Sequence, residues 1–373
     1  MWWLMAKFIG GVYRLGLKPV LFRFDPEVVH DRFTKNGELL GKQAWMRSVV
    51  TRLFRYDHPK LNQTIAGILF TNPVGLSAGF DKDGRLVNIL PAVGFGYSQV
   101  GTVTKQAYQG NPKPRLYRLP KSHGIVVNYG LKNDGVEAIV ARLRKRQSAQ
   151  PFPISISIGK TNCRATASMT GGVEDYKAGL AAVVDSGMGD FYTINISCPN
   201  TFGGEPFTNG SDLEQLLQQL EKVADKPMFL KMPINLPWPE FKQLLEVAIK
   251  YGVTGVVIGN LNKNREDPAI KDVIPANIKG SVSGKPTWRL SNELINKTYQ
   301  EYGKDLVIIG VGGIFSAQDA YEKIKRGASL VQLITGMIFQ GPQLVGEINF
   351  GLVKLLERDG YRNISEAIGA YHR

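Results

Sequence analysis

The chain has 373 residues, of which 43% are hydrophobic and 21% are charged. This balance is typical of a globular protein with a large core, so it excludes disordered, collagen-like and fibrous chains. The net charge of +14 leaves three kinds of partner open: a nucleic acid, an anionic membrane surface and an anionic substrate. The two cysteines, Cys163 and Cys198, are too few for an iron–sulfur cluster or a disulfide framework, and they favour a reducing compartment.

Residues 1–24 are apolar but interrupted by cations. No uncharged run reaches the roughly 18 residues that a spanning helix needs, and no small-residue cleavage site follows as in a signal peptide. Aromatic and aliphatic side chains interleaved with Lys7, Arg14, Lys18 and Arg23 favour an amphipathic segment that lies at a membrane surface. The alternative is that these side chains pack on the protein's own core. Residues 1–60 hold eleven Lys or Arg and five Asp or Glu, a net charge of +6.

Beyond residue 60, short runs rich in apolar and β-branched residues alternate with loops and helical stretches. Eight such runs predict a closed (β/α)8 barrel of the TIM type, an α/β fold, rather than an open doubly wound sheet. Asp57-His58-Pro59 separates this part from the N-terminal region, so we expect a helical region at 1–60 and a barrel at 61–373. The eight predicted strands are residues 74–77, 97–104, 154–158, 191–198, 228–232, 255–260, 306–311 and 329–335.

Chemistry in a barrel of this type takes place at the carboxyl ends of the strands, so the polar residues that end each run are the candidates. The last two loops, with Gly312-Gly313, Ser316 and Thr335-Gly336, suit a phosphate, because glycines let backbone N–H groups approach an anion. The residues that end the runs are 78–82, 101–102, 195–200, 231, 260, 310–313 and 335–336.

Cations and amides dominate these ends. Lys82 and Lys231 would be costly to place at a barrel mouth unless anionic groups meet them, although each alone could be an ordinary surface lysine. A single asparagine is usually a turn residue, but five at loops and strand ends suit a planar substrate with imide and carboxylate edges. These five are Asn128, Asn133, Asn195, Asn200 and Asn260.

Cys198 is the candidate base, because it follows a strand and precedes Pro199 in a loop that could close over a ligand. A free thiol with a pKa near 8.5 is a few per cent thiolate at neutral pH, so we expect a usable base. Cys163 has no comparable setting and is expected to be structural. The four histidines suggest neither a hydrolase triad nor a metal site.

Together, several motifs resemble dihydroorotate dehydrogenase, and the resemblance runs nearly from end to end. They are GFDKDG at 79–84, GTVT at 101–104, NPKPRLYRL at 111–119, NISCPNT at 195–201 and IGVGGI at 309–314. The segments PVLFRFDPE at 19–27 and ISEAIGA at 364–370 are similar to the membrane-associated, quinone-linked class 2 of that family. Each motif alone is weak, whereas the set is specific.

The resemblance implies an FMN-containing barrel that oxidises dihydroorotate to orotate in pyrimidine biosynthesis, with ubiquinone or menaquinone as the electron acceptor. Cys198 would be the general base, and Arg118 would lie on the side of a quinone tunnel formed by the N-terminal helices. The implied substrate-binding residues are Lys82, Asn128, Asn133, Asn195, Asn200 and Asn260. The implied FMN-binding residues are Ala78, Gly79, Lys82, Thr102, Ser157, Asn195, Lys231, Gly284, Gly312, Gly313, Thr335 and Gly336.

The chain departs from class 2 at three places. Position 198 is cysteine, the class 1 base, where class 2 has serine. The substrate loop NYGLKN at 128–133 is one residue shorter, lacks the class 2 arginine and has Leu131 in place of phenylalanine. Near the flavin, Ser157, Gly259 and Ile334 replace asparagine, threonine and tyrosine.

Other readings remain open at this point. The nearest is a class 1 enzyme that uses fumarate or NAD, which Cys198 favours and the N-terminal region opposes. A flavin-binding protein without catalysis and a basic nucleic-acid binder are alternatives of another kind, although no recognition motif supports the latter. With no transit peptide evident, we expect a peripheral protein on the cytoplasmic side of a bacterial inner membrane.

Overall fold

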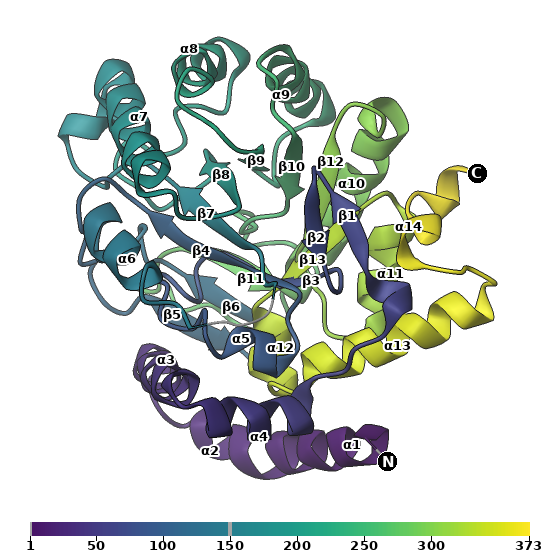
Figure 1. Ribbon diagram of the computed structural model, residues 1–373. Coiled ribbons are helices and arrows are strands. Elements are labelled where there is room, and N and C mark those ends of the chain that lie inside the picture. The colour runs from purple at the N-terminus through teal and green to yellow at the C-terminus, as the bar shows by residue number, and fades with distance from the viewer. Residues whose placement is uncertain (1, 148–150) are drawn as a thin grey trace.

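The computed structural model describes residues 2–147 and 151–373. Eight parallel strands close into a barrel in the order β10-β12-β13-β3-β4-β7-β8-β9, so the predicted TIM barrel is confirmed (Figure 1). All eight predicted strands are present, and several end one to three residues earlier than expected. Their bounds are β3 Val74–Leu76, β4 Tyr97–Val103, β7 Ile154–Ile158, β8 Phe191–Asn195, β9 Met228–Met232, β10 Gly255–Ile258, β12 Val307–Val311 and β13 Leu330–Leu333.

Helices surround the barrel and alternate with its strands (Figure 1). They are α5 Leu90–Val93, α6 Val136–Leu143, α7 Met169–Ser186, α8 Gly210–Leu220, α9 Trp238–Lys250, α10 Trp288–Tyr302, α11 Ala317–Lys325, α12 Thr335–Gln340, α13 Leu344–Arg358 and α14 Ile364–Ala367. Short turns of tighter helix lie at η2 Pro59–Leu61, η3 Ala165–Ala167, η4 Lys285–Thr287 and η5 Ala370–His372.

Strand β7 shows why these runs become barrel strands. Its isoleucines, residues 154, 156 and 158, belong to the hydrophobic layer shared with the helices, whereas Ser155 and Ser157 alternate with them and face inward. Ser155 Oγ lies 2.9 Å from Thr193 Oγ1 of β8, and Gln99 Nε2 of β4 donates to the same hydroxyl at 2.6 Å. The inside of the barrel is therefore partly polar, and these three side chains are paired across neighbouring strands.

An aromatic layer closes the amino end of the barrel. Phe70, Tyr97, Phe191 and Phe229 pack together there, with ring centroids 5.3 to 6.3 Å apart. Phe70 comes from a hairpin of β1 Gln63–Ile65 and β2 Ile68–Phe70, which the sequence analysis did not predict. This floor leaves the carboxyl end as the open end of the barrel.

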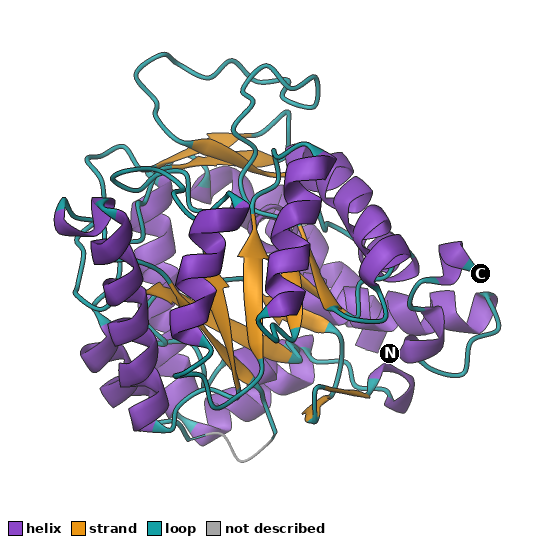
Figure 2. Cartoon of the chain, turned by 90° about the horizontal axis from the view of Figure 1, so that it is seen from above, coloured by secondary structure: helices purple, strands orange, loops and turns teal. Residues whose placement is uncertain are grey.

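A three-stranded antiparallel sheet lies over that open end (Figure 2). It consists of β5 Leu116–Leu119, β6 Gly124–Val127 and β11 Ser281–Gly284, in the order β11-β6-β5. The sequence analysis also missed this sheet. It matters for function because it roofs the cavity described below.

The N-terminal helices pack against one side of the barrel, beside α5, α12 and α13 (Figure 1). They are α1 Trp2–Val12, the π-helical turn η1 Tyr13–Leu17, α2 Lys18–Leu21, α3 Pro26–Lys42 and α4 Ala44–Phe54. Asp25 begins α3 by accepting a hydrogen bond from the backbone N–H of Val28 at 3.0 Å, and Pro26 occupies the first turn. The expected boundary at residue 60 falls within η2, between α4 and the hairpin.

Helix α1 packs on the protein with only part of its surface. The Trp3 ring stacks on Phe350 of α13 at 4.8 Å. Leu4 and Phe8 of α1 are 73% and 72% exposed, and Leu15 of η1 is 84% exposed. Among the described residues, no helix is both long and apolar enough to cross a membrane.

Candidate functional site

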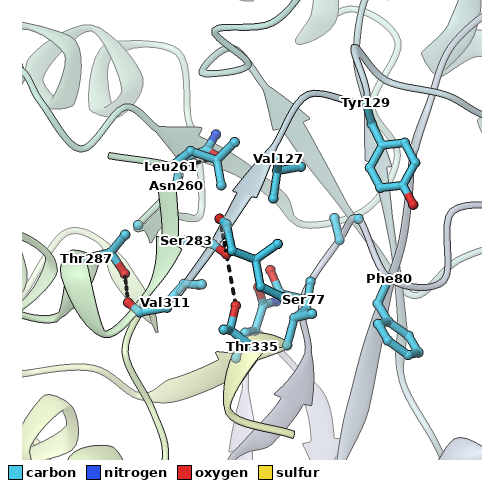
Figure 3. A pocket seen from close by; sticks show the side chains of 18 of the residues that line it. Ser77, Phe80, Val127, Tyr129, Asn260, Leu261, Ser283, Thr287, Val311 and Thr335 are labelled. Atoms are coloured by element: carbon cyan, nitrogen blue, oxygen red, sulfur yellow. Dashed lines mark hydrogen bonds between the residues drawn. The ribbon is translucent and has the colours of Figure 1, made fainter. Parts of the chain in front are cut away.

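A cavity with about 1260 Å³ of empty space, part of it open to solvent, lies between the carboxyl ends of the barrel strands and the three-stranded sheet (Figure 3). Fourteen of the predicted site residues line it, so the structure brings most of the candidates together. They are Ala78, Gly79, Lys82, Thr102, Asn195, Cys198, Asn200, Lys231, Asn260, Gly284, Gly312, Gly313, Thr335 and Gly336.

Two predicted substrate residues do not line the cavity, because other groups in the protein use their amides. Asn133 donates to Thr104 Oγ1 at 2.7 Å and to the Leu131 carbonyl at 2.8 Å, and it accepts from the Gly135 N–H at 2.8 Å. The Asn128 amide oxygen accepts a hydrogen bond from Asn111 Nδ2 at 3.1 Å. In this structure both asparagines hold the shape of the loop.

Ser157 and Arg118 also lie behind the cavity wall. Ser157 Oγ lies 3.0 Å from the hydroxyl of Thr102, which does line the cavity. Arg118 Nη1 donates to the Phe24 carbonyl at 2.7 Å, and its guanidinium lies 4.6 Å from the centroid of the Phe22 ring. Arg118 therefore joins the roof sheet to the segment that precedes α3.

Asn195 is held rigidly at the carboxyl end of β8. Its Nδ2 donates to Thr102 Oγ1 at 2.8 Å, and its backbone carbonyl accepts from the hydroxyl of the buried Tyr176 at 2.7 Å. Ser157, Thr102 and Asn195 thus form a hydrogen-bonded row along three neighbouring strands. A row of this kind fixes the direction of the amide, so the site can recognise a planar ligand without first ordering the side chain.

Lys82 and Lys231 are buried cations without a matching anion. Lys82 is 8% exposed and Lys231 is 5% exposed, and neither ammonium has a hydrogen-bond partner among residues 2–147 and 151–373. Lys82 Nζ lies 3.9 Å from the centroid of the Tyr129 ring. Burial lowers the pKa of each lysine to about 8. A ligand with negative charge or hydrogen-bond acceptors would supply the missing partners.

The thiol of Cys198 is more strongly protonated than the sequence analysis expected. The pKa of Cys198 is raised to about 11, chiefly by burial and also by Glu205, while the N–H of Asn200 and the ammonium groups of Lys231 and Lys160 act in the opposite direction. The expected few per cent of thiolate at neutral pH is therefore wrong, because desolvation disfavours the anion.

Glycines in the last two loops of the barrel are packed too closely against the protein to be replaced by a residue with a side chain. Gly313 has φ +71°, and a Cβ at this position would lie 2.4 Å from Cβ of Trp288. A Cβ at Gly336 would lie 1.9 Å from the Ile314 carbonyl oxygen. Ser316 caps α11 through the N–H of Asp319 at 3.1 Å, and Ser283 Oγ lies 3.0 Å from Thr335 Oγ1 (Figure 3).

The sequence analysis missed most of one wall of the cavity. This wall is largely apolar and comes from the roof sheet, from the loops after β3, β6 and β13 and from α3 and α12. His30 of α3 reaches it, where its Nε2 lies 2.8 Å from the Phe80 carbonyl oxygen. Phe80, Tyr129 and Ile334 lie in segments that the sequence analysis had placed at the site. No local pattern marks the others, because they lie in separate segments; they are His30, Leu116, Ile125, Val127 and Ile338.

Comparisons with known proteins agree with the geometry of the site. A family model described as dihydroorotate dehydrogenase matches residues 60–356. A dihydroorotate dehydrogenase (quinone) of Nostoc punctiforme is 34% identical over 372 residues, covering 96% of this chain and 98% of the relative. One from Sulfurovum is 37% identical over 356 residues, covering 95% and 97%.

Solved structures give the same result. The crystal structure of a DHODH from Eimeria tenella in complex with ferulenol superposes with a TM-score of 0.81 at 28% identity. The superposition covers 94% of this chain and 96% of the other. Since the family model spans most of the chain and the relatives match almost their entire length, the chain belongs to the dihydroorotate dehydrogenase family.

Proposed function

We propose that this chain is a quinone-dependent dihydroorotate dehydrogenase that oxidises dihydroorotate to orotate in pyrimidine biosynthesis, with FMN as its cofactor. The observation that carries the proposal is the composition of one cavity: a thiol at Cys198, two unpaired ammonium groups at Lys82 and Lys231, and an apolar wall on the N-terminal side. The cations and thiol suit an anionic substrate that must lose a proton, and the apolar wall suits a hydrophobic acceptor.

The residues present fit FMN. The cavity has room for a ligand of flavin size, and Gly284, Gly312, Gly313 and Gly336 line it without a side chain, so backbone N–H groups can approach an anion there. Gly284, Gly312, Gly313, Thr335 and Gly336 would hold the phosphate end, and Ala78, Gly79, Thr102, Asn195 and Lys231 would hold the ring, with Ser157 supporting Thr102. When bound, FMN would accept the hydride that leaves C6 of dihydroorotate.

The chain itself would bind the substrate and move one proton. Lys82 would neutralise the carboxylate, while Asn195, Asn200 and Asn260 would orient the pyrimidine ring. Asn128 and Asn133 would contribute by holding the substrate loop. The Cys198 thiolate would take the proton from C5, so that an S–H bond forms, the C5–H bond breaks and its electron pair becomes the C5=C6 double bond while a hydride leaves C6.

The positive charge of the cavity would stabilise two anions in this reaction. The carboxylate of the substrate would be stabilised by Lys82, and the thiolate of Cys198 by Lys231 and Lys160, whose charges already oppose the burial of the thiol. The substrate would also displace water from the cavity, which strengthens these interactions.

The quinone would approach along the apolar wall, between the roof sheet and the N-terminal helices. Leu116, Ile125 and Ile338 form part of this wall, and Arg118 lies beside it against Phe22. We assign residues 1–60 to this role and to peripheral association with the cytoplasmic face of the inner membrane. The exposed apolar face of α1, with Leu4 and Phe8, and the cation at Lys7 support that assignment.

A class 1 enzyme that uses fumarate or NAD is the second candidate, and the cysteine at position 198 is the observation that favours it. The deciding experiment is dihydroorotate oxidation by the purified protein with a short-chain quinone, fumarate or NAD as the only acceptor. We expect turnover with the quinone alone. Turnover with fumarate or NAD in preference to the quinone would overturn the proposed acceptor, and absence of dihydroorotate oxidation with every acceptor would overturn the proposed function.

A further inference from the structure

The loop that carries Cys198 is bound by the segment that follows β7. Residues 198–204, here called the Cys198 loop, follow β8 and fold back on themselves, since Thr201 Oγ1 donates to the Gly204 carbonyl at 2.8 Å. Phe202 lies at the tip of the loop with 51% of its surface exposed. A tip so exposed gains little from burial, so other contacts must hold the loop over the cavity.

Lys160 supplies one of these contacts. It follows β7, is only 3% exposed, and donates from Nζ to the Phe202 carbonyl at 2.7 Å and to the Thr166 carbonyl at 3.4 Å. No carboxylate lies within ion-pair distance of Lys160 among the described residues. Burying an ammonium that binds only carbonyl oxygens is costly. Lys160 does not line the cavity, so its contribution comes from these backbone contacts.

Asn162 supplies the second contact, two residues further along. Its Oδ1 accepts from the backbone N–H of Phe202 at 2.6 Å, and its Nδ2 donates to the Gly130 carbonyl at 3.1 Å. Both backbone polar groups of Phe202 are thus bound by the segment 160–162. Through Gly130, segment 160–162 also binds the substrate loop, so this one segment binds both loops at the cavity.

The charges around Lys160 agree with a role near the thiol. Burial lowers the pKa of Lys160, while Cys163, Cys198 and Asp175 act to raise it. Asp175 is already bound by the N–H and hydroxyl of Thr161 at 2.6 and 2.9 Å. On the other side of the thiol, Glu205 is paired with Lys263 at 2.6 Å. Lys160 and Lys231 are therefore the cations that face Cys198.

We propose that Lys160 is a positioning residue for proton abstraction: by binding the Phe202 carbonyl, it keeps the Cys198 loop closed and the thiol at the substrate. This inference rests on the proposed function, in which Cys198 removes the C5 proton. Lys160 does not line the cavity; it acts through the backbone of the loop, and its charge also favours the thiolate of Cys198.

The first test compares Lys160→Met with a matched control, Lys226→Met. Lys226 also donates to two carbonyl oxygens, those of Gly187 and Gly189, at 2.9 and 2.8 Å, but it lies at the amino end of the barrel. Hydrogen–deuterium exchange of the amides in residues 200–204 reports opening of the loop and does not depend on activity. We expect faster exchange in Lys160→Met and no change there in Lys226→Met.

The second measurement separates positioning from general stability. With dihydroorotate deuterated at C5, we expect a larger isotope effect on kcat in Lys160→Met than in the unaltered protein, because proton abstraction becomes slower relative to the other steps. Because the C5–H and C6–H bonds break in the same proposed step, the effect of deuterium at C6 should rise as well, whereas a loss of general stability would change neither isotope effect. The value of kcat should fall about 10- to 100-fold, the usual cost of a small misplacement of a catalytic group.

A second variant covers the case in which Lys160→Met does not fold. Asn162→Ala removes the hydrogen bond from the Phe202 N–H without altering a buried charge. It should change the amide exchange of the loop and the C5 isotope effect in the same direction as Lys160→Met. The unaltered protein must oxidise dihydroorotate for this test. The role of Lys160 is then overturned if folded Lys160→Met and Asn162→Ala show the same amide exchange in the loop and the same isotope effects as the unaltered protein. Inactivity of the unaltered protein overturns the proposed function instead.

Discussion

Glu27 and Lys132 form an ion pair at 3.1 Å that joins the N-terminal helical region to the wall of the cavity. Glu27 Oε1 also lies 2.9 Å from Nη1 of Arg115, so one carboxylate serves two cations. The Glu27 side chain is 4% exposed, whereas those of Arg115 and Lys132 are 12% and 28% exposed. The first turn of α3 therefore holds the 128–133 loop in place, so this contact joins the proposed quinone side of the site to the proposed substrate side.

Glu27→Gln should lower the free energy of unfolding by about 3 kcal/mol, because it leaves two largely buried cations facing a neutral amide. Urea unfolding followed by tryptophan fluorescence measures this difference. The matched control is Glu293→Gln, which breaks an exposed pair with Arg289 on one face of α10. That change should cost about 0.5 kcal/mol or less. Equal losses in the two variants would contradict a special role for Glu27.

Activity should rise with pH up to about 8, because the pKa of Cys198 is raised to about 11, while Lys82 and Lys231 keep their charge below their pKa of about 8. The base must be deprotonated to act, so in this range the thiolate fraction, and with it kcat/KM for dihydroorotate, grows about tenfold per pH unit. A pH profile between about 6 and 8 tests this. A plateau that begins near neutral pH would contradict it.

Variants at position 198 complete that test. Cys198→Ala should lose about 10²- to 10⁴-fold in kcat, the usual contribution of a general base. Cys198→Ser should need a higher pH than the unaltered protein, since a hydroxyl ionises less readily than a thiol. An unchanged pH dependence in Cys198→Ser would contradict this. Cys163→Ala is the control, and we expect it to leave the pH profile unchanged because Cys163 does not line the cavity.

Orotate binding should weaken as the pH rises through about 8, because burial lowers the pKa of Lys82 and of Lys231 to about that value. Above it the lysines lose their charge, and an anion gains less from them. Conversely, binding of orotate near pH 8 should take up protons, since the anion favours the charged lysines.

Titration calorimetry in two buffers of different ionisation enthalpy measures that proton uptake. In Lys82→Met the uptake should fall without vanishing, because Lys231 remains. Proton release, or an affinity that does not change between about pH 7 and 9, would contradict the assignment of these lysines to the anionic ligands.

Deletion of residues 1–24 should spare dihydroorotate oxidation by an artificial dye and lower quinone reduction by about tenfold or more, because part of a hydrophobic binding surface is lost. This deletion removes α1, η1 and α2 but keeps Glu27 and His30. It also removes the contacts of Tyr13 with the Ile338 carbonyl at 2.7 Å and of Phe22 with Phe339 at 5.3 Å. Unchanged quinone turnover would contradict the assignment of this region to the quinone.

The barrel was predictable because each strand carries its own signal. A run such as Ile154–Ile158, between loops with glycine or polar residues, can be recognised without its neighbours. The predicted ends were too long at residues 196–198 and 259–260, where the backbone leaves the sheet to face the cavity. Their side chains alone would allow the strands to continue. The strands end earlier because the backbone turns toward the cavity there.

The roof sheet was not predictable, because its strands are short and partly polar and β11 lies far from β5 and β6 in the sequence. Ser283 of β11 donates to the Ile125 carbonyl of β6 across 158 positions of sequence. The apolar wall of the cavity depends on this pairing, so His30, Leu116 and Ile125 could not be assigned to the site from local patterns.

The amino-acid sequence by itself determined which residues meet at the site, because parallel strands in a closed barrel bring all their carboxyl ends to one opening. Cys198, Lys82, Lys231 and Asn195 follow from that rule alone. The tertiary structure decided their chemical state. Burial and neighbouring charges set the pKa of Cys198 and of both lysines, and competition for hydrogen bonds withdrew the Asn133 amide from the cavity. Desolvation and hydrogen bonding depend on atoms that are distant in the chain, so no local pattern encodes them.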